Sequence, residues 1–222
     1  LAESLVSTGK KMGKSMTAII TDMSQPIGSH VGNGLEIIEC IELLKNKISK
    51  QSSDLYELCL VLASHMIFAG GKASSISQAR SVAVKTLENG SALRTFEEMI
   101  KVQGGDSNVI DNYRLLGESS GVFQMKARET GYITGLDAYL IGKAGIAVGA
   151  GRSKLDDQID HTSGFIFKKK ISDPVKTGDV IAEIHYSDDQ KLIDCLTLLE
   201  EAVKIGATMI GAPKIIHQIF KK

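Results

Sequence analysis

One short apolar run limits what the first half of this chain can form. The run Met16-Thr-Ala-Ile-Ile-Thr21 is nearly all apolar, as is typical of a strand covered on both faces in a parallel sheet. The rest of the first hundred residues has helical patterns only. A single strand cannot make a sheet, so we expect its neighbouring strands to lie outside this sequence. The chain also begins Leu-Ala-Glu without a methionine or a capping residue, and we expect it to start inside a helix of something longer.

Several helices are expected around this strand. One apolar face at helical spacing consists of Ile37, Cys40, Ile41 and Leu44. Two capping boxes mark further helix starts, one formed by Asp54 and Glu57 and one by Ser75 and Gln78. Another helix is expected over 91–103, after the Asn89-Gly90 stop signal. The first unit therefore has the pattern of an incomplete α/β domain.

The composition changes at Gly104-Gly-Asp-Ser-Asn108, which we take as a boundary between units at 1–104 and 105–222. Strand patterns dominate the second unit, at 122–127, 131–134, 165–167 and 180–186. Asp137 can cap a glycine-rich helix through Val148, and Ser187 with Gln190 can open a last helix that ends at Gly206. The predicted fold class is α/β followed by α+β.

Charge and cysteine content exclude several functional classes. Twenty-six basic side chains balance 26 acidic ones, so no global field draws the chain to nucleic acid or to an anionic membrane. No apolar run approaches the roughly 20 residues of a membrane helix. The three cysteines have no CxxC spacing, and we interpret Cys40, Cys59 and Cys195 as buried reduced thiols. A cytoplasmic location is the default.

Motifs along the whole chain carry a resemblance to a known family. The most extended is Thr21-Asp-Met-Ser-Gln-Pro-Ile-Gly-Ser-His-Val-Gly-Asn-Gly-Leu-Glu36. Others follow in order: Gln103-Gly-Gly-Asp106, Gly149-Ala-Gly-Arg152, Ile159-Asp160 and Gly178-Asp179. In order and spacing the chain resembles the C-terminal half of the pyrimidine-nucleoside and thymidine phosphorylases. Ser24-Gln-Pro is more similar to the broader pyrimidine-nucleoside type.

The resemblance implies a fold and a reaction. The first unit would be the remnant of a mixed-sheet α/β domain, with one strand plus helices, and the second an α+β domain with a hammerhead or barrel-sandwich-like sheet. Such enzymes cleave uridine or thymidine with phosphate as co-substrate, giving the free base and a pentose 1-phosphate, and the parent enzyme is expected to be a homodimer. The family's phosphate loop and base-binding residues lie upstream of this sequence. We therefore assign no catalytic or substrate-binding residue, and expect this chain alone to be inactive.

One site of the family does fall within this chain, a monovalent cation, usually potassium, held by two loop carbonyls and a glutamate. The matching positions are Ile27, His30 and Glu39. A loop that turns at Pro26 and Gly28 can point carbonyls inward, and a helical carboxylate supplies the charge that a hard cation prefers. Without the resemblance, Glu39 would be interpreted as a solvated helix residue.

Other notable residues have simpler interpretations. His65, beside an apolar helical stripe, is expected to be a core histidine. Lys168-Lys-Lys170 is expected to be a solvated strand end. The basic segment Gly149–Lys154 could form an anion nest, but a helix C-cap followed by a basic loop explains it more simply.

Two other functions stay open. The chain could be a non-catalytic truncated homologue or a binding module on the same fold. It could also be a biotin- or lipoyl-type carrier, since Gly131-Tyr-Ile133 and Val175-Lys-Thr-Gly-Asp179 are similar to the half-motifs of such domains. Against the carrier, Lys126 does not have the spacing that would place it on the exposed hairpin.

Overall fold

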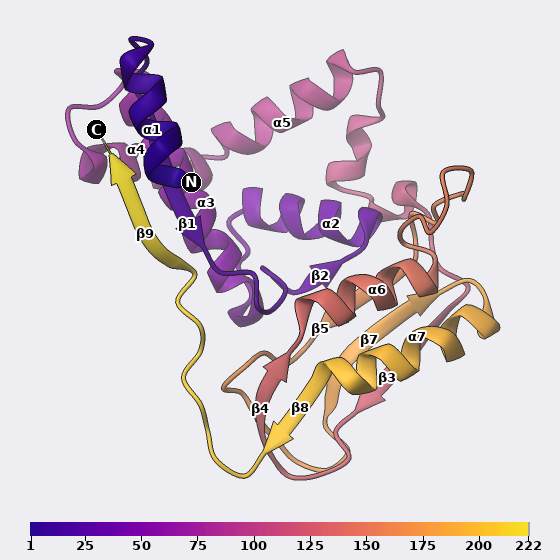
Figure 1. Cartoon of the computed structure of the whole chain (residues 1–222). Coiled ribbons are helices and arrows are strands. Elements are labelled where there is room, and N and C mark those ends of the chain that lie inside the picture. Colours follow the sequence, from indigo (N-terminus) through magenta and orange to yellow (C-terminus); the bar gives the residue numbers. More distant parts are fainter. Residues whose placement is uncertain (222) are drawn as a thin grey trace.

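The computed structural model describes residues 1–221 (Figure 1). The first unit has five α-helices, two strands and a short 3-10 turn, η1 (Lys50–Ser52). Its α-helices and strands are α1 (Ala2–Lys11), β1 (Thr17–Thr21), β2 (His30–Val31), α2 (Asn33–Leu44), α3 (Ser53–Ala69), α4 (Ile76–Glu88) and α5 (Ser91–Val102). The unit therefore contains two strands where the sequence predicted one.

Local signals set some of these helix ends correctly. The Ser75 side chain accepts a hydrogen bond from the backbone N–H of Gln78 at 3.1 Å, which confirms the predicted start of α4. The predicted capping box at Asp54 and Glu57 is wrong. Helix α3 begins at Ser53, and Glu57 forms an ion pair with Arg80. The Asp54 side chain instead accepts a hydrogen bond from the loop before β2.

The second unit contains two 3-10 turns, seven strands and two α-helices. They are η2 (Ser107–Ile110), η3 (Tyr113–Leu116), β3 (Gly121–Lys126), β4 (Gly131–Leu136), α6 (Ala138–Val148), β5 (Gly164–Phe167), β6 (Pro174–Val175), β7 (Val180–Tyr186), α7 (Asp189–Ala202), β8 (Val203–Gly206) and β9 (Ile216–Lys221). Asp137 caps α6 as predicted, because its carboxylate accepts from the backbone N–H of Leu140 at 3.0 Å.

Helices α6 and α7 pack beside each other and cover the strands of this unit (Figure 1). One sheet has the order β2-β5-β7-β3 and another the order β6-β4-β8, and all their pairings are antiparallel. Phe165 and Phe167 of β5 lie in this core with their rings edge to face, 6.4 Å apart. An α+β arrangement is therefore present in the second unit.

The last predicted helix differs from the structure at both ends. Asp188, not Ser187, caps α7 by accepting from the N–H of Lys191. The helix ends at Ala202 rather than Gly206, and Val203–Gly206 is strand β8, which pairs with β4. Val203 matches the apolar stripe of the helix, but β-branched residues also suit a strand. Here Val203 is in a strand because it pairs with the edge of β4.

Strand β1 has a partner that the sequence did not reveal. It pairs antiparallel with β9, so that Ile19 lies opposite Ile219 (Figure 1). The prediction that all neighbours of β1 lie outside the chain is therefore wrong for one edge. Within residues 1–221, β1 pairs with no strand other than β9. Ile20 remains 41% exposed, so this strand is not covered on both faces here.

Two strand pairings join the predicted units. Strand β2 of the first unit forms an edge of the sheet with β5, and β9 of the second unit pairs with β1. The boundary at 104/105 stays a prediction about how the chain divides. These pairings bring the loop between β1 and β2 against the second unit.

Candidate functional site

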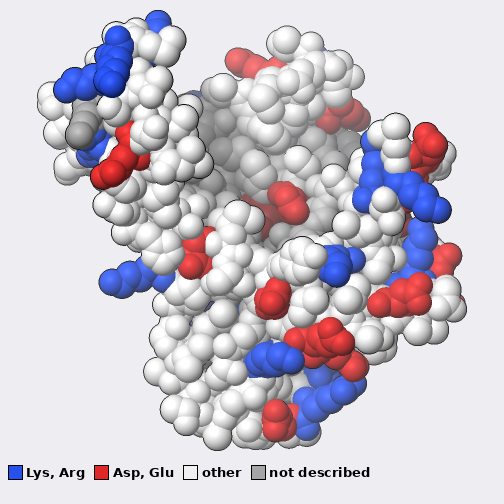
Figure 2. Space-filling view, viewed as in Figure 1, with Lys and Arg blue, Asp and Glu red and all other residues white. Residues whose placement is uncertain are grey.

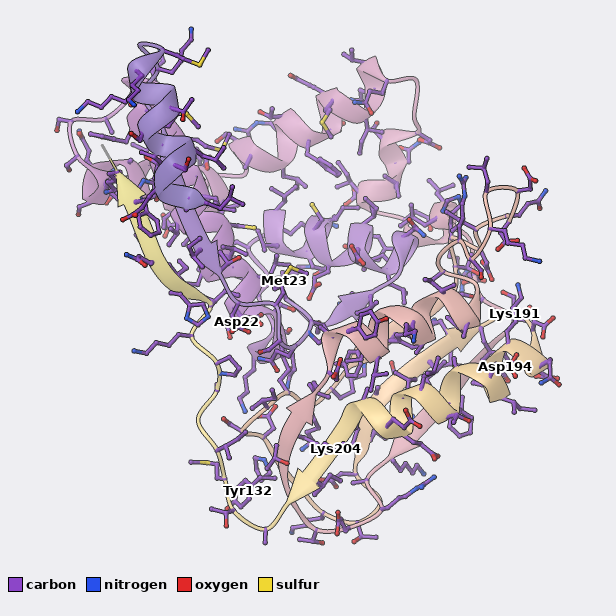
Figure 3. All side chains as sticks on the ribbon, in the orientation of Figure 1. Asp22, Met23, Tyr132, Lys191, Asp194 and Lys204 are labelled. Atoms are coloured by element: carbon purple, nitrogen blue, oxygen red, sulfur yellow. The ribbon has the colours of Figure 1, made fainter. Side chains whose placement is uncertain are left out.

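The candidate site is built on the loop between β1 and β2 and on the helix α2 that follows. The loop leaves β1 at Asp22, whose carboxylate accepts from the Ser24 N–H at 2.8 Å and lies 3.0 Å from His217 of β9. Figure 3 labels Asp22 and Met23 at this point, between β9 and the first helices. Met23 contributes to the wall of a cavity beside α2.

Two glycines allow the second unit to approach the start of α2. A Cβ added to Gly32 would lie 2.5 Å from the carbonyl oxygen of Ser163, and one added to Gly164 would lie 2.1 Å from that of Val31. Gly32 also has φ of 125°. The motif segment 31–36 therefore packs against Ser163 and Gly164, where β2 pairs with β5.

Glu39 lies in α2 and faces the loop rather than solvent, with 5% of its surface exposed. Its Oε1 accepts hydrogen bonds from the backbone N–H of Ser29 at 2.7 Å and from the hydroxyls of Ser29 and Ser52. Its Oε2 accepts a longer bond, 3.3 Å, from the backbone N–H of His30. Burial alone would raise the pKa of Glu39, but hydrogen bonds from His30, Ser52 and Ser29 outweigh it and lower this pKa to about 2. The interpretation of Glu39 as a solvated residue is therefore wrong.

The two carbonyls predicted as cation ligands lie in different parts of the backbone. That of His30 belongs to strand β2, and that of Ile27 to the loop before this strand. His30 lies opposite Ile166, between ladder positions, since Phe167 donates to the Ser29 carbonyl at 2.8 Å. In an extended strand the N–H and C=O of one residue point to the same side. The His30 N–H meets Glu39, so its carbonyl lies on the Glu39 side of the strand. The backbone and side-chain hydrogen bonds of residues 1–221 include none to the Ile27 carbonyl oxygen.

The chemical nature of these groups suits a monovalent cation. Two carbonyls without a hydrogen-bond donor and an ionised carboxylate with spare capacity on Oε2 are hard oxygen ligands. Within residues 1–221, no group of three or more His, Cys, Asp and Glu side chains is arranged to hold a metal ion. Any cation site here would therefore depend on backbone oxygens.

The sequence predicts Lys170 at a solvated strand end, but only 8% of this residue is exposed. This prediction is therefore wrong. The Lys170 ammonium donates to the carbonyls of Pro26 and Gly28, each at 2.8 Å, and pairs with Asp54. The other two lysines of the run are partly exposed and form ion pairs, Lys168 with Glu183 and Lys169 with Asp179. No local pattern distinguishes Lys170 from its neighbours.

An apolar cavity of about 650 Å³ opens beside the loop, between α2, α3, α4 and α6. Figure 2 shows this face of the molecule hollowed, mainly uncharged, with carboxylates inside the hollow. Cys40 and Cys59 both line it. Cys59 is exposed and Cys40 only half-buried, so the prediction of three buried thiols holds for Cys195 alone.

Three minor predictions agree with the structure. His65 is buried, and burial, with the nearby charge of Lys221, lowers its pKa. Gly149 adopts the left-handed conformation as the C-cap of α6. Lys126 is the last residue of β3, opposite Val180, and so belongs to the strand ladder rather than to a hairpin tip. None of them adds a group to the site.

Comparison with known proteins covers both units. Residues 132–206 match the family described as "Pyrimidine nucleoside phosphorylase C-terminal domain", and residues 1–93 match "Glycosyl transferase family, a/b domain". No helix within residues 1–221 has the length and apolar character to cross a membrane.

Individual relatives match almost the whole chain. The pyrimidine-nucleoside phosphorylase of Geobacillus stearothermophilus is 39% identical over 217 residues, which are 98% of this chain and 49% of the relative. Those of Staphylococcus aureus (strain bovine RF122 / ET3-1) and Staphylococcus haemolyticus (strain JCSC1435) are 38% identical over 219 residues, again 49% of the relative. The chain thus spans about half the length of the curated relatives that it matches. It belongs to the pyrimidine-nucleoside phosphorylase family and corresponds to the C-terminal part of these proteins.

Proposed function

We propose that this chain supplies the C-terminal part of a pyrimidine-nucleoside phosphorylase acting on uridine or thymidine. In that reaction a phosphate oxygen bonds to the anomeric carbon, the bond from this carbon to the base breaks, and the base leaves with the proton that the phosphate gives up. The observation that carries the proposal is similarity over 98% of the chain to a relative of that name. The hammerhead character of the second unit and a cytoplasmic location belong to the same proposal.

The chain's own contribution is structural rather than catalytic. Ile27, His30 and Glu39 would hold potassium through two backbone oxygens and one carboxylate. The ion would supply fixed positive charge beside the loop, and Glu39 would balance it. The open carbonyls and the ionised, buried Glu39 support this assignment.

The apolar cavity and the unpaired edge of β1 favour a missing structural partner. Groups that bind phosphate and pyrimidine would come from a polypeptide equivalent to the first half of the relatives, covering the cavity beside α2. The mostly apolar cavity lining, with residues such as Leu43, Leu44 and Leu60, supports that role. The complete enzyme is proposed to be a homodimer, with nucleoside and phosphate as its small-molecule partners.

The test is a complementation assay. The purified 222-residue chain is incubated with uridine, thymidine and phosphate, alone and after co-expression with the first half of the Geobacillus stearothermophilus relative. We expect no release of base from the chain alone and phosphate-dependent release from the pair. Activity of the chain alone would contradict the structural role, and a stable but inactive pair would favour the non-catalytic homologue or binding module.

The carrier alternative has its own test. A biotinyl or lipoyl group on Lys126 would add its mass to the intact chain. We expect the mass of the unmodified sequence, because Lys126 lies in the β3 ladder opposite Val180.

A further inference from the structure

A buried ammonium group holds the loop that carries the candidate cation ligands. Lys170 brings three acceptors together, the carbonyls of Pro26 and Gly28 and the carboxylate of Asp54. Two carbonyls and a carboxylate are the kind of ligands that a hard cation takes. Lys170 therefore acts on this loop as a cation that is tethered to the second unit.

The same contacts orient the peptide group between Ile27 and Gly28. The N–H of Gly28 donates to Asp54 Oδ1 at 3.1 Å. This peptide bond is trans, since no cis peptide occurs within residues 1–221, and in a trans peptide the C=O and N–H point in opposite directions. The carbonyl of Ile27 therefore points away from the Lys170–Asp54 pair and stays free for another ligand.

The tether itself is fixed at its base. The backbone N–H of Lys170 donates to Asp173 Oδ2 at 2.9 Å, and the other oxygen of that carboxylate pairs with Lys50. Close by, the N–H of Ile171 donates to the side chain of Gln25 at 3.2 Å. These contacts fix the Lys170 ammonium relative to the second unit. Its hydrogen bonds to the Pro26 and Gly28 carbonyls then hold the loop in place.

We propose that Lys170 is a positioning residue for the cation loop. With Asp54 as its counter-ion, it fixes the peptide groups on both sides of Ile27 and so presents the Ile27 carbonyl to the candidate site. This rests on the proposed function in one respect, the identity of the ion at Ile27, His30 and Glu39. The orientation of the loop by Lys170 is independent of that ion.

The first experiment measures the loop directly. Lys170→Met keeps the length and removes the charge, and Lys169→Met is the matched control, because Lys169 contacts Pro174 and Asp179 but not the loop. Amide hydrogen exchange is followed by NMR at Gly28, Ser29 and His30. We expect exchange to accelerate on the order of tenfold or more in Lys170→Met alone. Unchanged exchange at these amides would overturn the proposal.

A second variant tests the tethered-cation idea by chemical rescue, and also covers a failure of Lys170→Met to fold. Lys170→Ala removes the atoms that propylammonium contains, and the protein is refolded with this amine or with n-propanol. We expect the amine alone to raise the melting temperature of Lys170→Ala and to slow exchange at Gly28. Equal effects of amine and alcohol, or none, would overturn the proposal.

The third measurement concerns the ion. The melting temperature of the complemented protein is titrated with KCl against LiCl at constant ionic strength. We expect Lys170→Met to require on the order of tenfold more potassium than the parent and Lys169→Met, and an equal requirement would overturn the role of Lys170 at the site. A parent protein that does not respond to potassium would refute the proposed ion instead, and the exchange and rescue results would still decide the role of Lys170.

Discussion

The two units of this molecule bury their apolar side chains to different extents. The second unit encloses a core of its own, with Ile133, Ile184 and Leu199 all fully buried. The first unit contributes Ile41 to one small buried cluster, which Val109 and Ile110 of the second unit complete, and it leaves an apolar cavity open beside α2. The first unit therefore leaves apolar surface uncovered, whereas the second unit encloses its core.

The largest expected effect comes from making the same substitution, leucine to alanine, once in each unit. Leu199→Ala in the enclosed core should lower the free energy of unfolding by about 3–5 kcal/mol, because it leaves a cavity that cannot collapse. Leu43→Ala on the wall of the open cavity should cost roughly 1 kcal/mol, since this side chain is only half-buried. Urea unfolding of both variants measures the difference, and equal losses would contradict the comparison.

The next effect tests whether the loop against α2 depends on an ionised Glu39. The pKa of this carboxyl falls from an ordinary 4.5 to about 2 in the folded chain. A lowered pKa stabilises the fold above the unfolded value, so this contribution is complete above about pH 4.5 and is lost as the pH falls toward 2. It corresponds to roughly 3 kcal/mol.

Glu39→Gln should therefore lower stability at pH 7 and flatten its dependence on pH between about 4.5 and 2. The control is Glu98→Gln, on an exposed position of α5. Thermal melting across this pH range gives both results. An unchanged pH profile in Glu39→Gln would show that the buried contacts do not favour the ionised form.

A smaller effect is expected at the β1–β9 pair, which joins the ends of the described chain. Ile219→Pro removes a backbone donor opposite Ile19 and should cost about 1–2 kcal/mol. Amide exchange should accelerate in β1 while β4 and β7, which lie in the enclosed unit, keep their protection. Ile219→Val is the matched control, and loss of protection in β7 would mean that the two units unfold together.

The smallest effect belongs to the hydrogen-bonded pair of Asp22 and His217 at the start of the loop. Asp22 and His217 lie 3.0 Å apart with His217 about half exposed, so Asp22→Asn should change stability by less than about 1 kcal/mol. Hydrogen bonds from Ser24, followed by one from His217, lower the pKa of Asp22. A double-mutant cycle with His217→Gln measures the pair, and a coupling well above this value would indicate that this side-chain pair, rather than strand pairing, holds the β1–β9 end.

Local sequence patterns predicted those elements whose partners lie within a few residues. The capping of α4 by Ser75 and of α6 by Asp137 involves donors three residues away, so the spacing alone was sufficient. The same reasoning failed at Asp54, because its side chain is used 26 residues away at Gly28 and at Lys170, 116 residues away. A capping residue and a long-range ligand can share one local pattern.

By itself, the sequence determined the family and the segment in which a candidate site would lie, because both depend on motif order along the chain. Tertiary structure alone decided that β9 pairs with β1, that Glu39 is buried by Ser29 and Ser52, and that Lys170 holds the loop. Each of these depends on which groups meet when sheets and helices pack. A buried charge is stable only where hydrogen-bonding partners surround it, and a short stretch of sequence does not specify partners that come from elsewhere in the chain.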